Sequence, residues 1–218
     1  MNESNSSLVV SSQLEPHKNL AKLVCKYQQT VMQDSIPKHA HDAFKLANQF
    51  VDGDSIILDS GCGIGESSYR LAEQYPDIKV LAIDKSAARV QRSSVYGRRP
   101  DNLLIVQADC IYLWRLIHQA QWQIKQHYLL YPNPWPKPGH LQRRWHAHPV
   151  FPTLIALGGE LTMRTNWLVY AQEFSQALEL VTERENCLQR IQPRNTITPF
   201  ERKYMQSGHL LYEVRIEL

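Results

Sequence analysis

One stretch constrains the fold more than any other: residues 55–76, SIILDSGCGIGESSYRLAEQYP. It opens with a short β-branched run, which favours a buried strand. Three glycines follow within residues 61–65 and predict a tight turn. Apolar residues at helical spacing then predict a helix that ends before Pro76. A strand, a glycine turn and a helix in this order are the building unit of an α/β protein.

The same order recurs along the chain. Further strands are predicted at 79–84, 102–109, 127–132 and 158–165, and helices at 36–50, 86–96, 110–118 and 167–182. Only the fourth strand is followed first by a polar loop and then by a helix. Successive strand-helix units predict a mostly parallel sheet with helices on both faces.

The last forty residues change character. Residues 186–192 and 209–218 are predicted as two strands joined by a loop without a helix, forming an antiparallel pair at the edge of a seven-stranded sheet. The fold class is therefore α/β, a single Rossmann-like domain over residues 36–218. Residues 1–35 are predicted to be a leader, disordered over roughly its first ten to fifteen residues, and the start of a helical cap.

Composition limits the function classes. The 218 residues contain 43% hydrophobic and 21% charged residues, a balance typical of a folded globular domain, and no apolar run approaches the ~20 residues of a membrane span. Four scattered cysteines without a C-x-x-C pair argue against a zinc site and a disulfide framework, which favours the cytoplasm. His146 and His148 lack a third ligand at metal-binding spacing, so no metal is expected. A net charge of +3 does not by itself indicate nucleic acid.

The glycine turn marks the expected ligand site, because ligands bind at the carboxyl ends of parallel strands. A dinucleotide fold would place a third glycine where this chain has Glu66, an anion that would repel a pyrophosphate. Asp59, Asp84 and Asp109 end three successive strands and together suit a nucleoside, with Asp84 placed for the ribose hydroxyls and Asp109 for an adenine amine. S-adenosylmethionine meets these requirements. The alternative is that the acids are helix N-caps, which aspartate favours.

After the fourth strand the chain reads Tyr131-Pro-Asn-Pro-Trp-Pro-Lys137, followed by His140 and by Arg143-Arg144. This loop resembles that of bacterial tRNA (guanine-N7)-methyltransferases. Thr165-Asn-Trp, Thr198-Pro-Phe-Glu-Arg and Gly208-His also resemble that family's motifs in order, so that the resemblance runs from about residue 55 to 217.

The resemblance implies a class I methyltransferase fold, S-adenosylmethionine as cofactor, tRNA as partner and a monomer or homodimer. It places Asn133 at the reacting base and beside the cofactor, which Asp59, Gly61, Gly63, Asp84 and Asp109 would hold. The residues implied to face RNA are Lys137, Arg143, Arg144, Asn166, Thr198 and Glu201.

Two positions depart from the family pattern: Asn133 and Asn166 stand where the family has aspartate. An amide keeps the acceptor but loses the negative charge that would stabilise a cationic product base. Two other functions therefore stay open. One is an RNA- and cofactor-binding module with lost or altered catalysis, and the other is a small-molecule methyltransferase, against which the basic loop counts.

Overall fold

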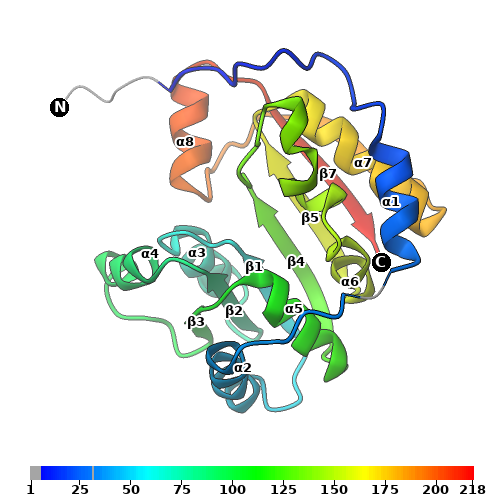
Figure 1. Cartoon of the computed structure of the whole chain (residues 1–218). Coiled ribbons are helices and arrows are strands. Elements are labelled where there is room, and N and C mark those ends of the chain that lie inside the picture. The colour runs from blue at the N-terminus through cyan, green and yellow to red at the C-terminus, as the bar shows by residue number, and fades with distance from the viewer. Residues whose placement is uncertain (1–5, 31) are drawn as a thin grey trace. The chain divides into compact units, whose positions relative to one another are not determined.

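The computed structural model describes residues 6–30 and 32–218. Those residues form two compact units, each of which is described by itself. Of the described residues, unit 1 contains 6–30, 32, 131–152 and 162–216, and unit 2 contains 33–130, 153–161 and 217–218. Figure 1 labels the elements of both.

Helices and strands alternate along most of the chain, as the sequence pattern predicts. The strands are β1 (Ile56–Ser60), β2 (Lys79–Asp84), β3 (Leu103–Gln107), β4 (Ile124–Leu130), β5 (Glu160–Thr165), β6 (Cys187–Ile191) and β7 (Leu211–Glu217). The α-helices are α1 (Leu20–Gln28), α2 (Lys38–Val51), α3 (Glu66–Gln74), α4 (Ala87–Gln91), α5 (Cys110–Gln119), α6 (Phe151–Ala156), α7 (Leu168–Thr182) and α8 (Pro199–Gln206). Three 3-10 helices are η1 (Arg92–Tyr96), η2 (Pro138–Arg143) and η3 (Trp145–Ala147).

The seven strands run in the order β3-β2-β1-β4-β5-β7-β6. In unit 2, β1 pairs in parallel with β2 on one side and with β4 on the other, so the strand order reverses next to β1. In unit 1, β6 and β7 pair antiparallel, Cys187 opposite Arg215. The predicted α/β class, mostly parallel sheet and antiparallel edge pair are confirmed.

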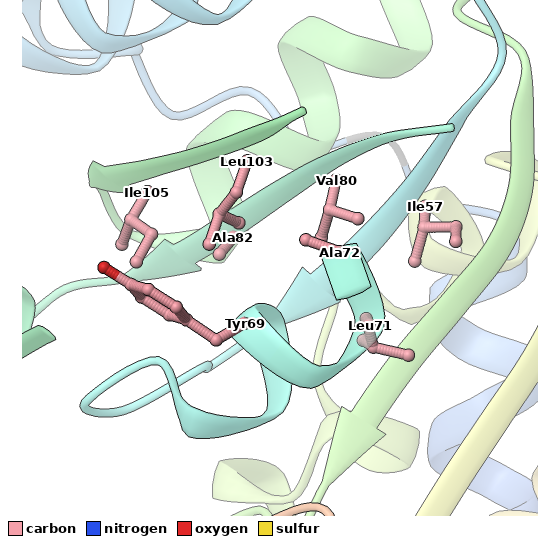
Figure 2. Close-up of a cluster of buried hydrophobic side chains, with 8 residues drawn as sticks. All are labelled: Ile57, Tyr69, Leu71, Ala72, Val80, Ala82, Leu103 and Ile105. Atoms are coloured by element: carbon pink, nitrogen blue, oxygen red, sulfur yellow. The ribbon is translucent and has the colours of Figure 1, made fainter. Parts of the chain in front are cut away.

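Helices cover both faces of the unit 2 strands. On one face α3 packs on β1, β2 and β3, forming the cluster that Figure 2 shows: Ile57, Tyr69, Leu71, Ala72, Val80, Ala82, Leu103 and Ile105. Side chains alternate along a strand, so Ser60 points to the other face. There its hydroxyl accepts a hydrogen bond from the indole of Trp114 on α5 at 2.9 Å, and α2 packs beside α5. The glycine turn is therefore fixed to a rigid, doubly covered β1.

The predicted helix-free connection between β6 and β7 is wrong, because α8 lies between them. Thr198 is its N-cap, and the Thr198 hydroxyl accepts a hydrogen bond from the backbone N–H of Glu201 at 2.9 Å. Pro199 occupies the first helical position. Thr198-Pro199 is thus a helix start that local sequence rules could have predicted, with a threonine N-cap and a proline at the first helical position.

The N-terminal segment contacts the rest of unit 1. From Ser6 onward, the Ser6 N–H donates to the Ser207 hydroxyl at 2.9 Å and the Ser11 hydroxyl to the Pro136 carbonyl. The buried side chain of Gln13 donates to Glu173 at 2.7 Å, and α1 packs beside α7 (Figure 1). Residues 1–5 lie outside the described part, and the disordered leader stays a prediction.

The turn into β5 contains two glycines with left-handed backbones, Gly158 at φ +75° and Gly159 at φ +79°. A Cβ at Gly159 would lie 2.3 Å from the carbonyl oxygen of Ile124, whereas one at Gly158 would meet nothing within 4 Å. We expect Gly158→Ala to cost about 1 kcal/mol of unfolding free energy from the backbone alone. Gly159→Ala should cost more, about 3 kcal/mol, because the overlap adds to that strain. Urea unfolding measures both, and equal losses would show that β4 yields without cost.

Candidate functional site

The glycine turn after β1 is held open by its backbone. Gly61, Gly63 and Gly65 have φ values of +77°, +63° and +86°, a region that favours glycine. The N–H groups of Gly61 and Cys62 donate to the Ile83 carbonyl at 2.8 and 2.9 Å, which anchors the turn to the end of β2. A Cβ at Gly61 or Gly63 would meet no atom within 4 Å, so a ligand has room beside the turn.

Asp59, the last acid of β1, is 1% exposed. Its Oδ2 accepts the hydroxyls of Ser67 and Ser68, each at 2.6 Å, while Oδ1 has no hydrogen-bond partner among the described residues. Burial raises the pKa of Asp59, and the two serine hydroxyls counter that rise. A buried carboxylate oxygen without a partner is costly, and it suits a cationic or N–H-bearing ligand group.

Asp84, at the end of β2, stabilises the turn as well. Its Oδ2 accepts the N–H of Gly63 at 3.0 Å, its Oδ1 accepts the N–H of Ser86 at 2.8 Å, and Arg89 lies 3.3 Å from Oδ2. A carboxylate offers about four acceptor sites, so roughly one remains for a ribose hydroxyl. The predicted ribose contact stays a prediction, with more competition than the sequence suggested.

Asp109 is the N-cap of α5, and its Oδ1 accepts the N–H of Ile111 at 2.9 Å. The N-cap alternative is therefore confirmed for this residue. Its adenine contact stays a prediction. Glu66 lies buried in the first turn of α3 and accepts from Arg70 at 2.9 Å, so an anion already occupies the place where a pyrophosphate would bind.

The loop from Tyr131 to His146 belongs to unit 1. Tyr131 and Trp135 have φ values of +54° and +45°, conformations that side chains other than glycine adopt at a cost. Between them, Asn133 is exposed and its Oδ1 accepts the N–H of Trp135 at 3.3 Å. The side-chain oxygen of Asn133 is thereby held by a neighbour in its own loop.

Thr198 and Glu201 were expected to face the nucleotide, but both are buried, Glu201 at 0% exposure. Glu201 Oε1 accepts the Tyr131 hydroxyl at 2.8 Å and the Arg164 guanidinium at 3.0 Å, while Oε2 accepts the N–H of Ile197 at 2.8 Å. These partners occupy the carboxylate on the inside of unit 1. The two residues therefore cap α8 and hold Tyr131, where the Pro-Asn-Pro-Trp loop begins.

Arg144 was expected to contact RNA, and the structure corrects this, because its side chain is 0% exposed. Its guanidinium forms a 2.5 Å ion pair with Glu173 and donates to the Trp135 carbonyl at 3.1 Å. Arg143 is exposed, with its guanidinium 4.8 Å from the centre of the Trp135 ring, and Lys137 is exposed as well. The loop cations that can reach a phosphate are thus Lys137 and Arg143.

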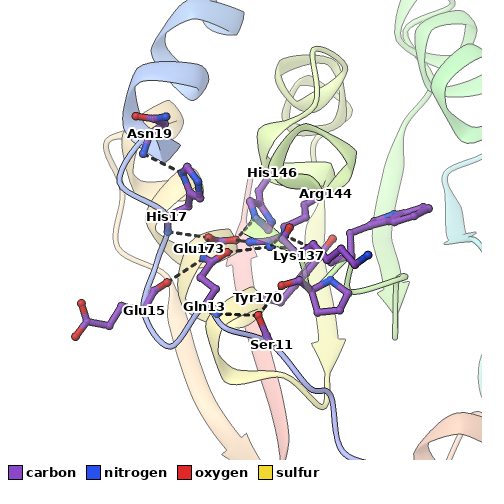
Figure 3. Close-up of polar contacts among 12 residues, drawn as sticks. Ser11, Gln13, Glu15, His17, Asn19, Lys137, Arg144, His146, Tyr170 and Glu173 are labelled. Carbon is purple, nitrogen blue, oxygen red and sulfur yellow. Dashed lines mark hydrogen bonds and ion pairs between the residues drawn. The ribbon is translucent and has the colours of Figure 1, made fainter. Parts of the chain in front are cut away.

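Glu173 on α7 is the centre of a buried cluster that the sequence analysis missed (Figure 3). It accepts Nε2 of His146 at 2.9 Å, the Gln13 amide at 2.7 Å and the N–H of His17 at 2.9 Å, besides Arg144. Burial alone would raise the pKa of Glu173, but His146 and Arg144 hold that pKa at about 2. The sequence did hold a signal for this cluster, because Glu173 lies on the apolar side of α7, between Tyr170 and Ala177.

Asn166 donates its amide to Nδ1 of His209 at 3.0 Å, and Nε2 of His209 lies 3.0 Å from the Ser6 carbonyl. The amide at Asn166 therefore has a hydrogen-bond partner within unit 1 in this chain.

The described residues contain neither a metal-binding cluster nor a membrane-spanning helix. Among residues 6–30 and 32–218, no three His, Cys, Asp or Glu side chains come together as a metal site would require. None of the helices in the same part of the chain combines the length and apolar character needed to cross a bilayer.

Solved structures with the same architecture are methyltransferases. "Structure of an antibiotic related Methyltransferase" aligns with a TM-score of 0.61 and 11% identity over 87% of this chain and 97% of that chain. The 16S rRNA methyltransferase KamB aligns with a TM-score of 0.54 and 16% identity over 85% of this chain and 96% of that chain. At these identities the likeness shows the fold alone, which is that of class I methyltransferases.

A family model described as "Putative methyltransferase" matches residues 53–214. The chain belongs to this methyltransferase family. Its relatives include the tRNA (guanine-N(7)-)-methyltransferase of Brevibacillus brevis, 30% identical over 178 residues, 76% of this chain and 82% of the relative. That of Treponema pallidum (strain Nichols) is 27% identical over 164 residues, 73% of this chain, and this match spans only 65% of the relative's length.

Because Arg144 is buried and Arg143 is exposed, we expect their substitution by alanine to lower the unfolding free energy by different amounts. Arg144→Ala would leave the buried Glu173 carboxylate without its cation and should cost about 3 to 5 kcal/mol of unfolding free energy. Arg143→Ala removes an exposed charge and a ring contact, so it should cost about 1 kcal/mol or less. Denaturant unfolding of both variants measures the difference. Comparable small losses would contradict the buried ion pair.

Proposed function

We propose that this protein is an S-adenosylmethionine-dependent tRNA (guanine-N7)-methyltransferase of the cytoplasm. The observation that carries the proposal is the open glycine turn beside Asp59, whose buried Oδ1 has no partner in the described part of a chain related to enzymes of that name. The turn offers backbone to a ligand and the carboxylate offers a negative charge, which suits the ammonium group of the methionine moiety.

In this proposal Asp59, Gly61, Gly63, Asp84 and Asp109 hold the cofactor. When bound, S-adenosylmethionine supplies a methyl group on a sulfonium. Guanine N7 presents a lone pair, so the residues of this chain need only position the base in line and need not remove a proton. The methylated base is cationic, and Asn133 would face it with an amide dipole instead of the family's carboxylate.

Of the residues predicted to bind RNA, only those with accessible side chains can contact it directly in this proposal. Lys137 and Arg143 are exposed and would contact phosphates, whereas Asn166 is half-buried and would face the nucleotide. Thr198, Glu201 and Arg144 are positioning residues in this proposal, because they set the shape of the loop from inside unit 1.

A second function is favoured by the two asparagines. If Asn133 and Asn166 remove the charge on which catalysis depends, the protein binds RNA and cofactor without transferring the methyl group. The 3.0 Å contact between Asn166 and His209 supports this function, because the amide at position 166 has a fitting partner in this chain. Methyl transfer to unmodified tRNA, with mapping of the modified base, separates the two functions.

Cofactor binding is tested at Asp84. Asp84→Ala removes the ribose acceptor and one anchor of Gly63, so S-adenosylmethionine affinity should fall by about 1 to 3 kcal/mol, roughly 5- to 150-fold. Asp101→Ala is the control, since Asp101 is an exposed acid paired only with the exposed Arg98. Calorimetric titration gives both affinities. An unchanged affinity in Asp84→Ala, or tighter binding of a nicotinamide dinucleotide, would refute the site.

Catalysis is tested at Asn133. Asn133→Asp restores a negative charge where the base becomes cationic and should raise maximal turnover by about tenfold, with little change in apparent tRNA affinity. Asn133→Ala, which removes the acceptor, should lower turnover. Asn133 is the better position to vary, because Asn166 already forms a hydrogen bond with His209 at 3.0 Å.

Lower turnover in Asn133→Asp would show that the amide serves another target atom. If the parent protein and Asn133→Asp both bind cofactor and tRNA but neither methylates the tRNA, the non-catalytic function is established.

A further inference from the structure

A second basic surface lies in unit 2, on α4, η1 and the loop that follows. Residues 85–99 contain five of the chain's 24 lysines and arginines and no acidic residue. We call this set the α4 basic patch: Lys85, Arg89, Arg92, Arg98 and Arg99. Like charges at this density repel one another, so their retention calls for an anionic partner or full solvation.

The packing of the segment turns these cations outward. Val90 and Tyr96 pack against the hydrophobic cluster of Figure 2. Ser93 is buried, and its hydroxyl donates to the Val90 carbonyl at 2.7 Å. The inward side of α4 and η1 is therefore occupied by uncharged residues. All five cations of the α4 basic patch are exposed.

The patch is only partly neutralised. Arg89 lies 3.3 Å from Asp84, and Arg98 lies 3.5 Å from Asp101, a pair in which both side chains are almost fully exposed and which is therefore weak. Lys85, Arg92 and Arg99 have no carboxylate partner in the part of the chain that the structure describes. Several positive charges thus face solvent together.

The α4 basic patch lies next to the glycine turn, where it could contact the phosphates of a bound RNA. It begins one residue after Asp84, and the Tyr96 hydroxyl lies 3.3 Å from Glu66 at the start of α3, so the patch adjoins the glycine turn within unit 2. An RNA that brings a base to a cofactor at this turn must bring its phosphates nearby. Guanidinium groups bind phosphate with two parallel hydrogen bonds, and four of the five cations are arginines.

We propose that the α4 basic patch binds the phosphodiester backbone of the RNA substrate and supplies a large part of the salt-dependent affinity. This inference rests on the proposed function. It adds a contact surface in unit 2 that is separate in sequence from the loop cations Lys137 and Arg143.

The test compares two triple variants of the full chain. Arg92→Ala/Arg98→Ala/Arg99→Ala removes patch charges away from Asp84. The matched control, Lys38→Ala/Lys45→Ala/Lys125→Ala, removes three exposed unit 2 charges, two of them on α2, which packs with α5 on the opposite face. Filter binding of unmodified tRNA over a series of salt concentrations gives affinity and salt slope, and calorimetry with S-adenosylmethionine verifies that each variant is folded.

The patch variant should lose about tenfold or more in tRNA affinity at low salt, and its slope of log affinity against log salt should flatten by about two. The control should lose little and keep its slope, and both should bind cofactor like the parent. A patch variant that keeps affinity and slope while the parent binds and methylates tRNA overturns this inference alone. A parent that does not bind tRNA overturns the proposed function and the patch together.

Discussion

Unit 1 depends on the hydrogen bonds and the ion pair of one buried carboxylate, that of Glu173. This carboxylate binds the N-terminal segment at Gln13 and His17, and the loop after β4 at Arg144 and His146. A buried charge is tolerated only when its partners are complete, so none of these segments can leave without exposing an unmet charge. The loop after β4 is thus held from inside unit 1 by Glu173 at Arg144 and His146, while Glu201 holds its first residue, Tyr131.

Much of unit 2 was predictable because its signals are local. The run before Gly61, the glycine spacing and the helical pattern after Gly65 each specify a conformation within a few residues, and a parallel sheet follows from repeating that unit. The acids at the strand ends were also located correctly in sequence. Their hydrogen bonds were not, since Asp84 and Asp109 both serve nearby backbone N–H groups that only the folded turn and helix place within reach.

Unit 1 was harder to predict, and the reason is physical. Arg143 and Arg144 are adjacent arginines, but Arg143 is exposed and Arg144 is buried, because Arg144 pairs with Glu173 on a helix 29 residues further along the chain. Sequence alone reports the charge and not the distant partner that allows its burial. Glu201 illustrates the same limit, because its motif predicted a residue that faces the nucleotide, whereas its buried carboxylate accepts the Tyr131 hydroxyl through tertiary packing.

The docked N-terminal segment has a consequence for synthesis. Its contacts at Ser6 and Ser11 span 201 and 125 residues of sequence, so this segment is synthesised well before the residues that it contacts. Unit 2, by contrast, draws most of its residues from one continuous stretch, 33–130, with neighbouring strand-helix pairs. Local contacts form faster than distant ones. A nascent chain should therefore hold a largely formed glycine turn well before unit 1 can close around its buried carboxylate.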